Sequence, residues 1–150
     1  MCPDFSFLPT EKDGFTHCFV CGQDNPIGLK LKFTKEGRTV KTEFIPGELY
    51  QGWPGLIHGA IIMALLDEAM SYACYYNGYD SVTGKLSTKL KKPAKIAEPL
   101  IVTGNITRIS KKLIETRATV ALKNGETVAE GVGTMFILKK NSYYMEGSEQ

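Results

Sequence analysis

The sequence predicts an α+β domain in which an antiparallel β-sheet wraps around one long central helix. Residues 59–76 form a stretch of helical length without proline, and its first two turns are apolar on every side. Six shorter segments flank this stretch, two before it and four after it, and they carry alternating apolar residues and turn signals. We expect a helix that is apolar all round to be buried on every side, which needs a sheet that curls about it.

The composition is that of an ordinary globular protein, with 43% hydrophobic and 23% charged residues in 150. We predict a single domain over 1–150, with an irregular lead-in over 1–17 and a loose tail over 141–150. The net charge of +2 is too small to indicate nucleic acid or a membrane, so we expect neither as a partner. No secretory signal or membrane span is recognisable, and the four cysteines do not resemble a disulfide framework. We therefore expect a cytoplasmic location.

The first predicted element is a β-hairpin. Leu29, Leu31 and Phe33 alternate with polar residues, which is the period of a half-buried strand. Glu36-Gly37 then turns the chain, and residues 39–44 return it.

The helix is predicted from Gly59 to about Tyr76, because Asn77-Gly78 is a good C-terminal stop. Four strands follow, at about 84–91, 100–109, 113–122 and 126–138. Asn124-Gly125 between the last two is a strong hairpin signal. Successive hairpins imply an antiparallel sheet with open edges, and pairing such edges across a two-fold axis is a common solution. We therefore expect a dimer.

Two adjacent carboxylates, Asp67 and Glu68, interrupt the apolar helix. Burying a carboxylate among Ile, Met and Leu side chains is costly unless it is paired or hydrogen-bonded. A carboxylate in this setting therefore favours a functional role over chance placement. The two side chains point about 100° apart around the helix, so they do not share one environment.

The helix also carries a recognisable motif. His58-Gly59-Ala60 followed by Leu66-Asp67, with the acid nine residues after the histidine, resembles the motif of hotdog-fold acyl-CoA thioesterases. The lead-in resembles that of one branch of this superfamily, in Cys18-Phe19-Val20-Cys21-Gly22, Asn25-Pro26 and Gly28-Leu29. The segment after the helix, Val82-Thr83-Gly84-Lys85-Leu86 followed by Lys92-Pro93, resembles the corresponding strand of PaaI-like and human mitochondrial thioesterase-superfamily members. The resemblance covers roughly residues 18–138. It implies a hotdog fold and hydrolysis of a CoA thioester to free acid and coenzyme A, with no cofactor beyond the substrate.

Gly59 is the predicted oxyanion donor. The N–H groups at a helix N-terminus are unpaired and carry the positive end of the helix dipole. Glycine permits the close approach of a thioester carbonyl because it has no Cβ. The resemblance implies the same role. His58 either borders the acyl site or is a hydrogen-bonded structural residue that holds the turn.

Asp67 is the predicted catalytic carboxylate. It lies eight residues beyond Gly59, about 12 Å along the helix, so both cannot reach one carbonyl. The resemblance implies that Asp67 faces across a dimer interface, with each site shared between subunits. It would act as general base on water or attack the thioester directly. Alternatively, it is a helix carboxylate that meets solvent, and Glu68 is an interface or supporting group.

Other positions enter through the resemblance. Thr83 matches a position where relatives carry a hydroxyl that orients the attacking water, although threonine is also a common strand residue. The PaaI pattern places an asparagine six residues before the histidine, where this chain has Gly52, so we assign the amide to neighbouring Gln51. Ala60 replaces the commoner second glycine, which narrows the space beside the carbonyl.

Two basic clusters are the predicted binding site for the nucleotide end of coenzyme A. The resemblance places them there, and lysines serve phosphates as point charges. For any single lysine, a solvated strand end is an equally simple interpretation. The clusters are Lys91, Lys92 and Pro93, and Ser110, Lys111 and Lys112.

Cys18 and Cys21 have the spacing of metal or redox sites, but a structural zinc site needs four ligands and no second pair exists. A thioredoxin-like context is absent as well. We therefore predict structural thiols and no metal. Three tyrosines near the helix end, Tyr72, Tyr75 and Tyr76, either line an acyl channel or pack the helix end.

Three functions fit this sequence. The leading hypothesis is an acyl-CoA thioesterase, as a homodimer or a dimer of dimers with its sites at the subunit interface. The second is a hotdog module that binds acyl-CoA without hydrolysing it. The third is an enoyl-CoA hydratase, for which His58 would be the only candidate partner of the acid. The identity of the acyl group is not readable from the sequence.

Overall fold

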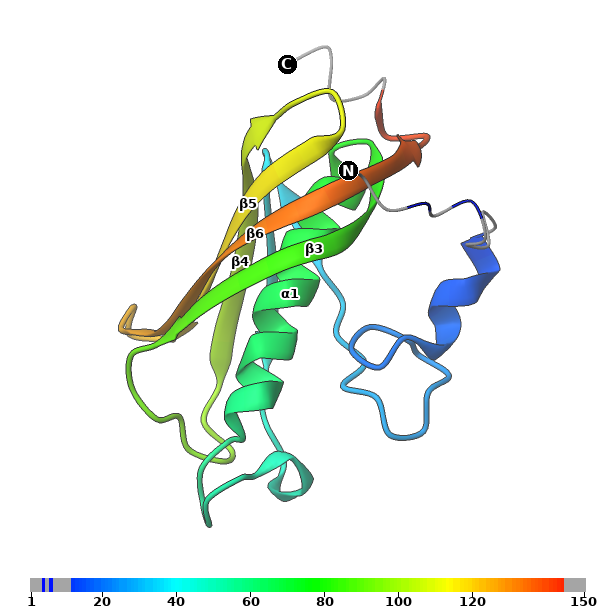
Figure 1. Ribbon diagram of the computed structural model, residues 1–150. Coiled ribbons are helices and arrows are strands. Elements are labelled where there is room, and N and C mark those ends of the chain that lie inside the picture. Colours follow the sequence, from blue (N-terminus) through cyan, green and yellow to red (C-terminus); the bar gives the residue numbers. More distant parts are fainter. Residues whose placement is uncertain (1–3, 5, 7–11, 145–150) are drawn as a thin grey trace. The chain divides into compact units, whose positions relative to one another are not determined.

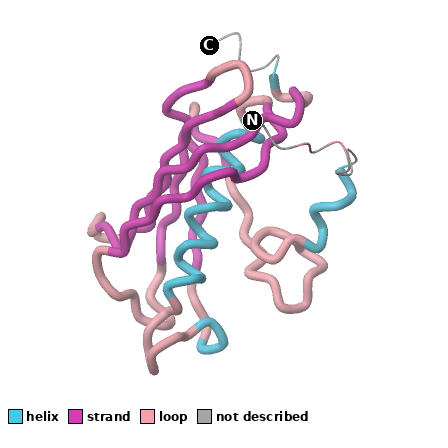
Figure 2. The backbone as a smooth tube through the Cα atoms, viewed as in Figure 1, coloured by secondary structure: helices cyan, strands magenta, loops and turns pink. Residues whose placement is uncertain are grey.

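The computed structural model describes residues 4, 6 and 12–144 and divides the chain into two compact units, residues 1–32 and 33–150. The first unit holds a 3-10 helix, η1 (Lys12–His17), followed by loops (Figure 2). The predicted lead-in lies partly outside the described residues. None of the helices in the described residues is long and apolar enough to cross a membrane.

The second unit is one long helix against a six-stranded antiparallel sheet, as predicted (Figure 1). The spatial order of the strands is β1-β2-β4-β5-β6-β3, and a 3-10 helix, η2 (Glu48–Tyr50), precedes α1. The elements are β1 (Thr34–Glu36), β2 (Thr39–Phe44), α1 (Gly59–Tyr76), β3 (Tyr79–Leu90), β4 (Leu100–Ile109), β5 (Leu113–Leu122) and β6 (Thr127–Lys140).

The core lies between α1 and the sheet. Leu65, Leu66 and Met70 of α1 are fully buried, and the helix contacts β2 through β6. Gly104 on β4 allows close approach, because a Cβ at this position would lie 2.6 Å from the carbonyl carbon of Ala69. The helix therefore packs with its backbone near the middle of the sheet.

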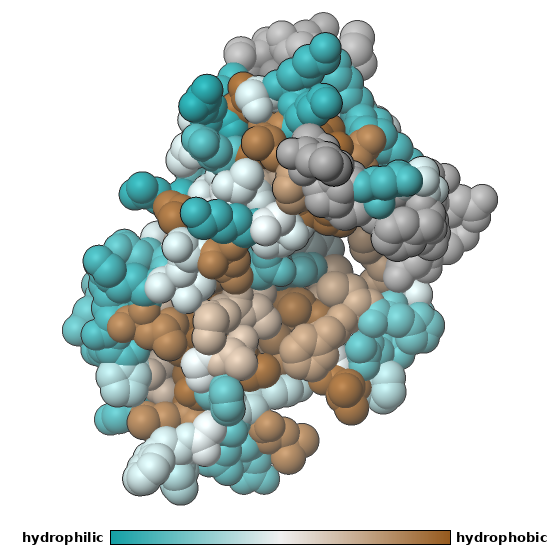
Figure 3. All heavy atoms as spheres, in the orientation of Figure 1, coloured by the Kyte–Doolittle hydropathy of each residue, from teal (hydrophilic) through white to brown (hydrophobic). Residues whose placement is uncertain are grey.

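The prediction that α1 is buried on every side is wrong for a single chain. Ala60 is exposed, and Met63, Ala64 and Asp67 are only half-buried. Apolar side chains gather over α1 on the face shown in Figure 3. The apolar first turns of α1 therefore include a side that the chain itself does not cover.

The predicted strand over residues 29–34 is also corrected. Leu29, Leu31 and Phe33 are buried as their alternation indicates, but Lys30 has a left-handed backbone with φ of 56°. A strand cannot continue through that conformation. The N–H groups of Leu29 and Leu31 instead donate to the Phe19 and Val20 carbonyls, and the ladder begins only at Thr34.

Strand β3 starts five residues earlier than predicted, directly after the Asn77-Gly78 stop, and it forms one edge of the sheet.

The predicted loose tail is anchored at its start, since Asn141 Nδ2 donates to the Tyr75 carbonyl and to Asp80 Oδ1. Residues 145–150 lie outside the described part. The helix bounds and those of β4 and β5 match the prediction.

Candidate active site

The N-terminus of α1 presents one backbone donor without a partner. His58 is the N-cap residue, and its Nδ1 accepts a hydrogen bond of 2.9 Å from the Ala60 N–H. The His58 carbonyl accepts from the N–H groups of Ile61 and Ile62 at 3.0 and 3.2 Å. Among residues 12–144, no acceptor pairs with the N–H of Gly59. This N–H is therefore available to an external acceptor.

The cap fixes the tautomer of His58. Because Nδ1 accepts a hydrogen bond, the proton of the neutral ring lies on Nε2. His58 is exposed, and its Nε2–H is a donor and not an acceptor. The structure thus gives His58 a structural role at the helix start, and it leaves one N–H that could contact a ligand.

The loop before α1 is tightly closed. Gln51 Oε1 accepts from the Gly55 N–H at 3.0 Å, and Gln51 forms a bridge with Ile57. A Cβ on Gly52 would lie 3.1 Å from Cδ2 of His58, so glycine lets the loop pass directly beside the ring. The oxygen of the Gln51 amide is therefore used within the loop, and Gln51 shapes the approach to His58.

Asp67 and Thr83 form the second part of the site. Thr83 Oγ1 on β3 donates a 2.6 Å hydrogen bond to Oδ1 of Asp67 on α1. A short bond of this kind to a carboxylate is among the stronger hydrogen bonds in proteins. Within the described part of the chain, Asp67 has no other hydrogen-bond partner. The threonine thus orients the carboxylate and leaves Oδ2 available.

The two parts of the site lie at opposite ends of β3. A Cβ on Gly59 would lie 3.2 Å from Cδ1 of Leu90, the last residue of the strand, whereas Asp67 is bound to Thr83 near its beginning. One chain does not bring Gly59 and Asp67 together. Leu90 was not among the predicted site residues, and its only signal was its place at the end of an alternating run.

The basic clusters are likewise separated within one chain. Leu90 pairs with Ala129, whereas Val82 and Leu113 both pair with Phe136 on β6. The segment 91–93 therefore follows one end of the sheet, and the segment 110–112 caps the other. A single chain does not assemble one phosphate site from both clusters.

Several members of the basic clusters already have partners. Lys91 and Lys92 form ion pairs of 3.3 and 2.8 Å with Glu130 and Glu126, and all four side chains are partly exposed. Ser110 Oγ donates to the Leu113 carbonyl at 3.0 Å. Exposed ion pairs of this kind contribute little to stability and exchange readily with other charges. The glutamates were not predicted, because Glu126 just before β6 and Glu130 on β6 lie far from the lysines in the sequence.

Pro93 and its neighbours support the loop before the helix. The Ala94 carbonyl accepts from the Ile57 N–H at 2.9 Å, and the Ile96 N–H donates to the Gly55 carbonyl at 3.0 Å. The chain after β3 and the chain before α1 are therefore held together next to Gly59.

The tyrosines at the end of α1 pack against one another. Tyr72 stacks on Phe33 with ring centroids 4.8 Å apart, and Tyr75 and Tyr76 both contact Tyr143. The hydroxyl of Tyr76 donates to the Phe33 carbonyl at 3.3 Å. This geometry favours packing of the helix end over a channel lining.

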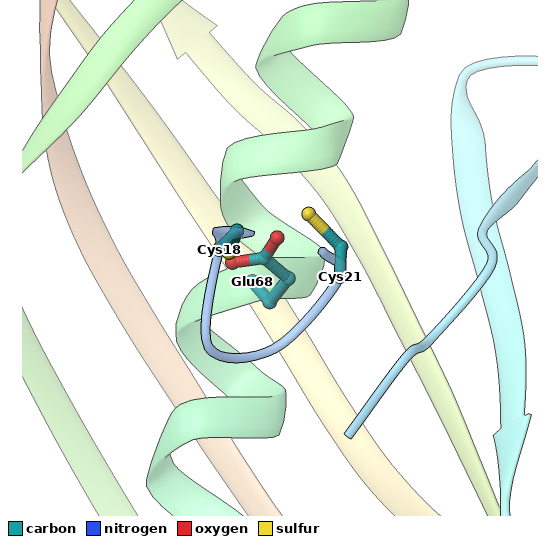
Figure 4. Close-up of side chains that lie close together, drawn as sticks. All are labelled: Cys18, Cys21 and Glu68. Carbon is teal, nitrogen blue, oxygen red and sulfur yellow. The ribbon is translucent and has the colours of Figure 1, made fainter. Parts of the chain in front are cut away.

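Three residues discussed in the sequence analysis are drawn in Figure 4: Cys18 and Cys21, considered there for a metal or redox site, lie on one turn of the first unit, and Glu68 lies on α1. Glu68 follows Asp67 on the helix and has interactions of its own. The absence of a metal stays a prediction.

Comparison with known proteins identifies the architecture. Residues 54–129, from the loop before α1 into β6, match the family described as thioesterase superfamily. No curated protein matches the chain. The thioesterase superfamily protein RHA08564 has a TM-score of 0.76 and 26% identity over 81% of this chain and 60% of that one. These matches and the helix-on-sheet architecture confirm the predicted hotdog fold.

Two further solved structures share the fold at lower identity. The protein smu.793 from Streptococcus mutans, bound to acetyl-CoA, has a TM-score of 0.70 and 22% identity, covering 75% of this chain and 91% of that chain. The PaaI protein from the Escherichia coli phenylacetic acid degradation operon has a TM-score of 0.70 and 17% identity, with coverage of 75% and 83%.

Proposed function

Because this chain belongs to the thioesterase superfamily, we propose that it hydrolyses acyl-CoA thioesters to a free acid and coenzyme A. The observation that carries the proposal is the carboxylate of Asp67, oriented by Thr83 and open at its second oxygen. The acetyl-CoA bound to smu.793 supports a CoA thioester as the substrate class. The acyl group stays unassigned.

We propose further that two copies of the chain share each site. β3 is an edge strand with mostly exposed residues from Thr83 to Leu90, and an exposed edge of this length is a template for pairing with another strand. An isologous two-fold pairing of β3 with its copy would be antiparallel and would place both helices on the same face of a continuous sheet.

The register of that pairing follows from the two contacts of β3. Thr83 and Leu90 are seven residues apart, but both face α1, because a bulge between Thr83 and Lys85 shifts the alternation of β3 by one residue. Residues directly opposite in an antiparallel pair point to the same face. With Thr83 of one protomer opposite Leu90 of its partner, Gly59 of one copy approaches Asp67 of the other. The same two-fold axis brings the segment 91–93 of one copy toward 110–112 of the other. One two-fold axis thus brings together both Gly59 with Asp67 and the segment 91–93 with the segment 110–112.

In such a shared site the reaction divides between the two chains. The N–H of Gly59 donates to the thioester carbonyl oxygen, where negative charge develops during attack. Asp67 of the other protomer accepts a proton from water as the water oxygen attacks the carbonyl carbon. The carbon–sulfur bond then breaks, and coenzyme A leaves as a thiolate that takes up a proton. Direct attack by Asp67, followed by hydrolysis of the anhydride, gives the same products.

The geometry of His58 disfavours the hydratase alternative. Addition of water to an enoyl-CoA needs a base beside the acid, and the neutral ring of His58 presents a proton on Nε2 while Nδ1 caps the helix. The binding-module alternative differs from the thioesterase only in turnover, so the experiment must measure binding and thiol release together.

The test is Asp67→Asn, assayed for release of free thiol with short, long and aromatic acyl-CoAs. Loss of a general base or nucleophile lowers kcat by about 10²–10⁴-fold, while binding of acyl-CoA is retained. Glu68→Gln is the matched control, because it removes the adjacent carboxylate and should retain activity. Undiminished turnover by Asp67→Asn would remove its catalytic role. Tight binding by the wild type without thiol release would favour the binding module, and hydration of an enoyl-CoA would favour the hydratase.

A further inference from the structure

The segment Cys18–Gly22 in the first unit forms one closed turn that the proposed hydrolysis does not use. The Gly22 N–H donates to the Cys18 carbonyl at 2.9 Å, and the Cys18 N–H donates to the Phe15 carbonyl at 3.2 Å. An i to i+4 bond of this kind gives the chain the pitch of a helical turn. The two cysteines, three residues apart, then have Cα atoms about 5 Å apart.

The turn is held from both sides by hydrogen bonds within the same unit. The carbonyls of Phe19 and Val20 accept from Leu29 and Leu31 at 3.0 Å each. Gln23 Nε2 donates to the Cys21 carbonyl at 2.9 Å, and the Asp24 N–H donates to the Thr16 carbonyl at 2.9 Å. The backbone between the two cysteines is therefore fixed before any bond forms between their side chains.

Gly22 is required for this turn. A Cβ at position 22 would lie 2.5 Å from the Cys18 carbonyl oxygen and 2.6 Å from that of Thr16, which is closer than real Cβ contacts allow. Glycine thus lets the chain fold back tightly on Cys18.

The geometry of the turn suits a disulfide. The sulfur atoms of Cys18 and Cys21 lie within 4.8 Å of each other, and neither cysteine is in a disulfide (Figure 4). Disulfides join Cα atoms that are about 4.4–6.8 Å apart, so the backbone of this turn already has the separation that a disulfide needs.

We propose that Cys18 and Cys21 are a redox-modification site, a dithiol that closes to an intramolecular disulfide when a small-molecule disulfide such as glutathione disulfide is present. The substrate class is a low-molecular-weight disulfide, and the site is independent of Asp67, Gly59 and the proposed hydrolysis.

The reaction proceeds in two exchanges. The Cys18 thiolate attacks one sulfur of glutathione disulfide, and one glutathione leaves as a thiolate. The Cys21 thiolate then attacks the Cys18 sulfur of the mixed disulfide and releases the second glutathione. Two protein thiols are oxidised, one glutathione disulfide is reduced to two glutathiones, and the two protons pass to these products. Cys18 reacts first because it is the more exposed of the two: Cys18 is half-buried, whereas Cys21 is buried, with 9% of its surface exposed.

Cys74 provides an internal contrast. Its side chain is fully buried in the core between α1 and the sheet, and burial raises its pKa to about 11. The thiolate is the reactive form in disulfide exchange, so Cys74 should stay reduced under the same conditions.

The experiment uses the full chain, reduced and then treated with glutathione disulfide in the presence of EDTA. After acid quenching, residual thiols are alkylated under denaturing conditions and the tryptic peptides are weighed. The peptide over 13–30 contains both Cys18 and Cys21, and neither Cys2 nor Cys74. We expect this peptide to become lighter by two hydrogen atoms and to carry no alkyl group or glutathione, while Cys74 is alkylated.

Two variants test the order and the geometry. In Cys21→Ser the reaction should stop at a glutathione adduct on Cys18, which persists at least about tenfold longer than in the wild type because no neighbouring thiol resolves it. Gly22→Ala should show the same slow resolution through an opened turn, with both thiols still present. Cys74→Ala should form the disulfide at the wild-type rate.

Three results would overturn the proposal. They are a peptide over 13–30 that keeps both thiols in excess glutathione disulfide, two stable glutathione adducts on it, and a disulfide that joins it to another peptide. The wild-type peptide map decides among these without any variant, so a variant that fails to fold does not leave the question open.

Discussion

Replacement of Gly59 by proline removes one backbone N–H from the proposed site and changes little else. Gly59 is the first residue of α1, where proline is tolerated because the N–H of this position has no partner within the helix. His58 has φ of −65° and ψ of 135°, which is the extended conformation that a residue before proline prefers. The variant Gly59→Pro should therefore keep the helix and lose the only unpaired N–H found at its start among the described residues.

The size of the expected effect follows from the role of a single donor. Removing one hydrogen bond to a developing oxyanion costs about 2.7–4 kcal/mol, or roughly 10²–10³-fold in kcat. Gly59→Ala is the matched control, because it keeps the N–H and adds a methyl group 3.2 Å from the flexible end of Leu90. We expect Gly59→Ala to retain kcat within about tenfold of the wild type.

The assay is steady-state release of free thiol from an acyl-CoA that the wild type hydrolyses, with circular dichroism to confirm the helix content of both variants. A folded Gly59→Pro variant with wild-type kcat would show that this N–H does not stabilise the transition state. Equal losses in both variants would point to crowding near Leu90 and would refute the reasoning from the missing donor.

Two further predictions concern the groups around the site. Thr83→Val removes the 2.6 Å hydrogen bond to Asp67 at nearly constant volume, and a bond to a charged group is worth about 1.5–3 kcal/mol, so kcat should fall about 10–100-fold with little change in KM. Thr88→Val on the same face of β3 is its control, and equal effects of the two substitutions would contradict the assignment. Replacing both Lys111 and Lys112 by alanine should raise KM for acyl-CoA about 3–10-fold at low salt and less at high salt, because exposed charges are screened. Lys41→Ala, on an exposed position of β2, should leave KM unchanged, and a KM that is insensitive to both changes would exclude this cluster from nucleotide binding.

Local signals predicted most of the fold. The bounds of α1 follow from its apolar composition and from Asn77-Gly78, and the bounds of β4 and β5 follow from alternation between clear turns. The same reasoning gave a wrong strand around Lys30. The left-handed backbone of Lys30 interrupts the strand, but it does not change the alternation of apolar residues in the sequence. Alternation reports which side chains are buried, and it does not report which backbone groups pair.

The candidate site depended on contacts that no local pattern contains. Asp67 and Thr83 were both singled out, but their hydrogen bond exists because β3 packs beside α1. The pairing of Lys91 with Glu130 on β6, and of Lys92 with Glu126 just before β6, likewise depends on the β3–β6 register. The uncovered side of α1 could not be recognised from an apolar sequence, because the sequence does not distinguish burial within a chain from burial between chains.

The shared site is the central claim, and mixing two inactive variants tests it most directly. Gly59→Pro and Asp67→Asn are co-expressed with different affinity tags, and the heterodimer carrying both tags is purified. A two-fold dimer of this kind has one site with both intact groups and one site with neither. With shared sites, the heterodimer should release thiol at about half the wild-type rate, while each parent homodimer stays about 100-fold or more below it. A heterodimer no more active than its parents would contradict shared sites, because each chain would then need both groups for its own site.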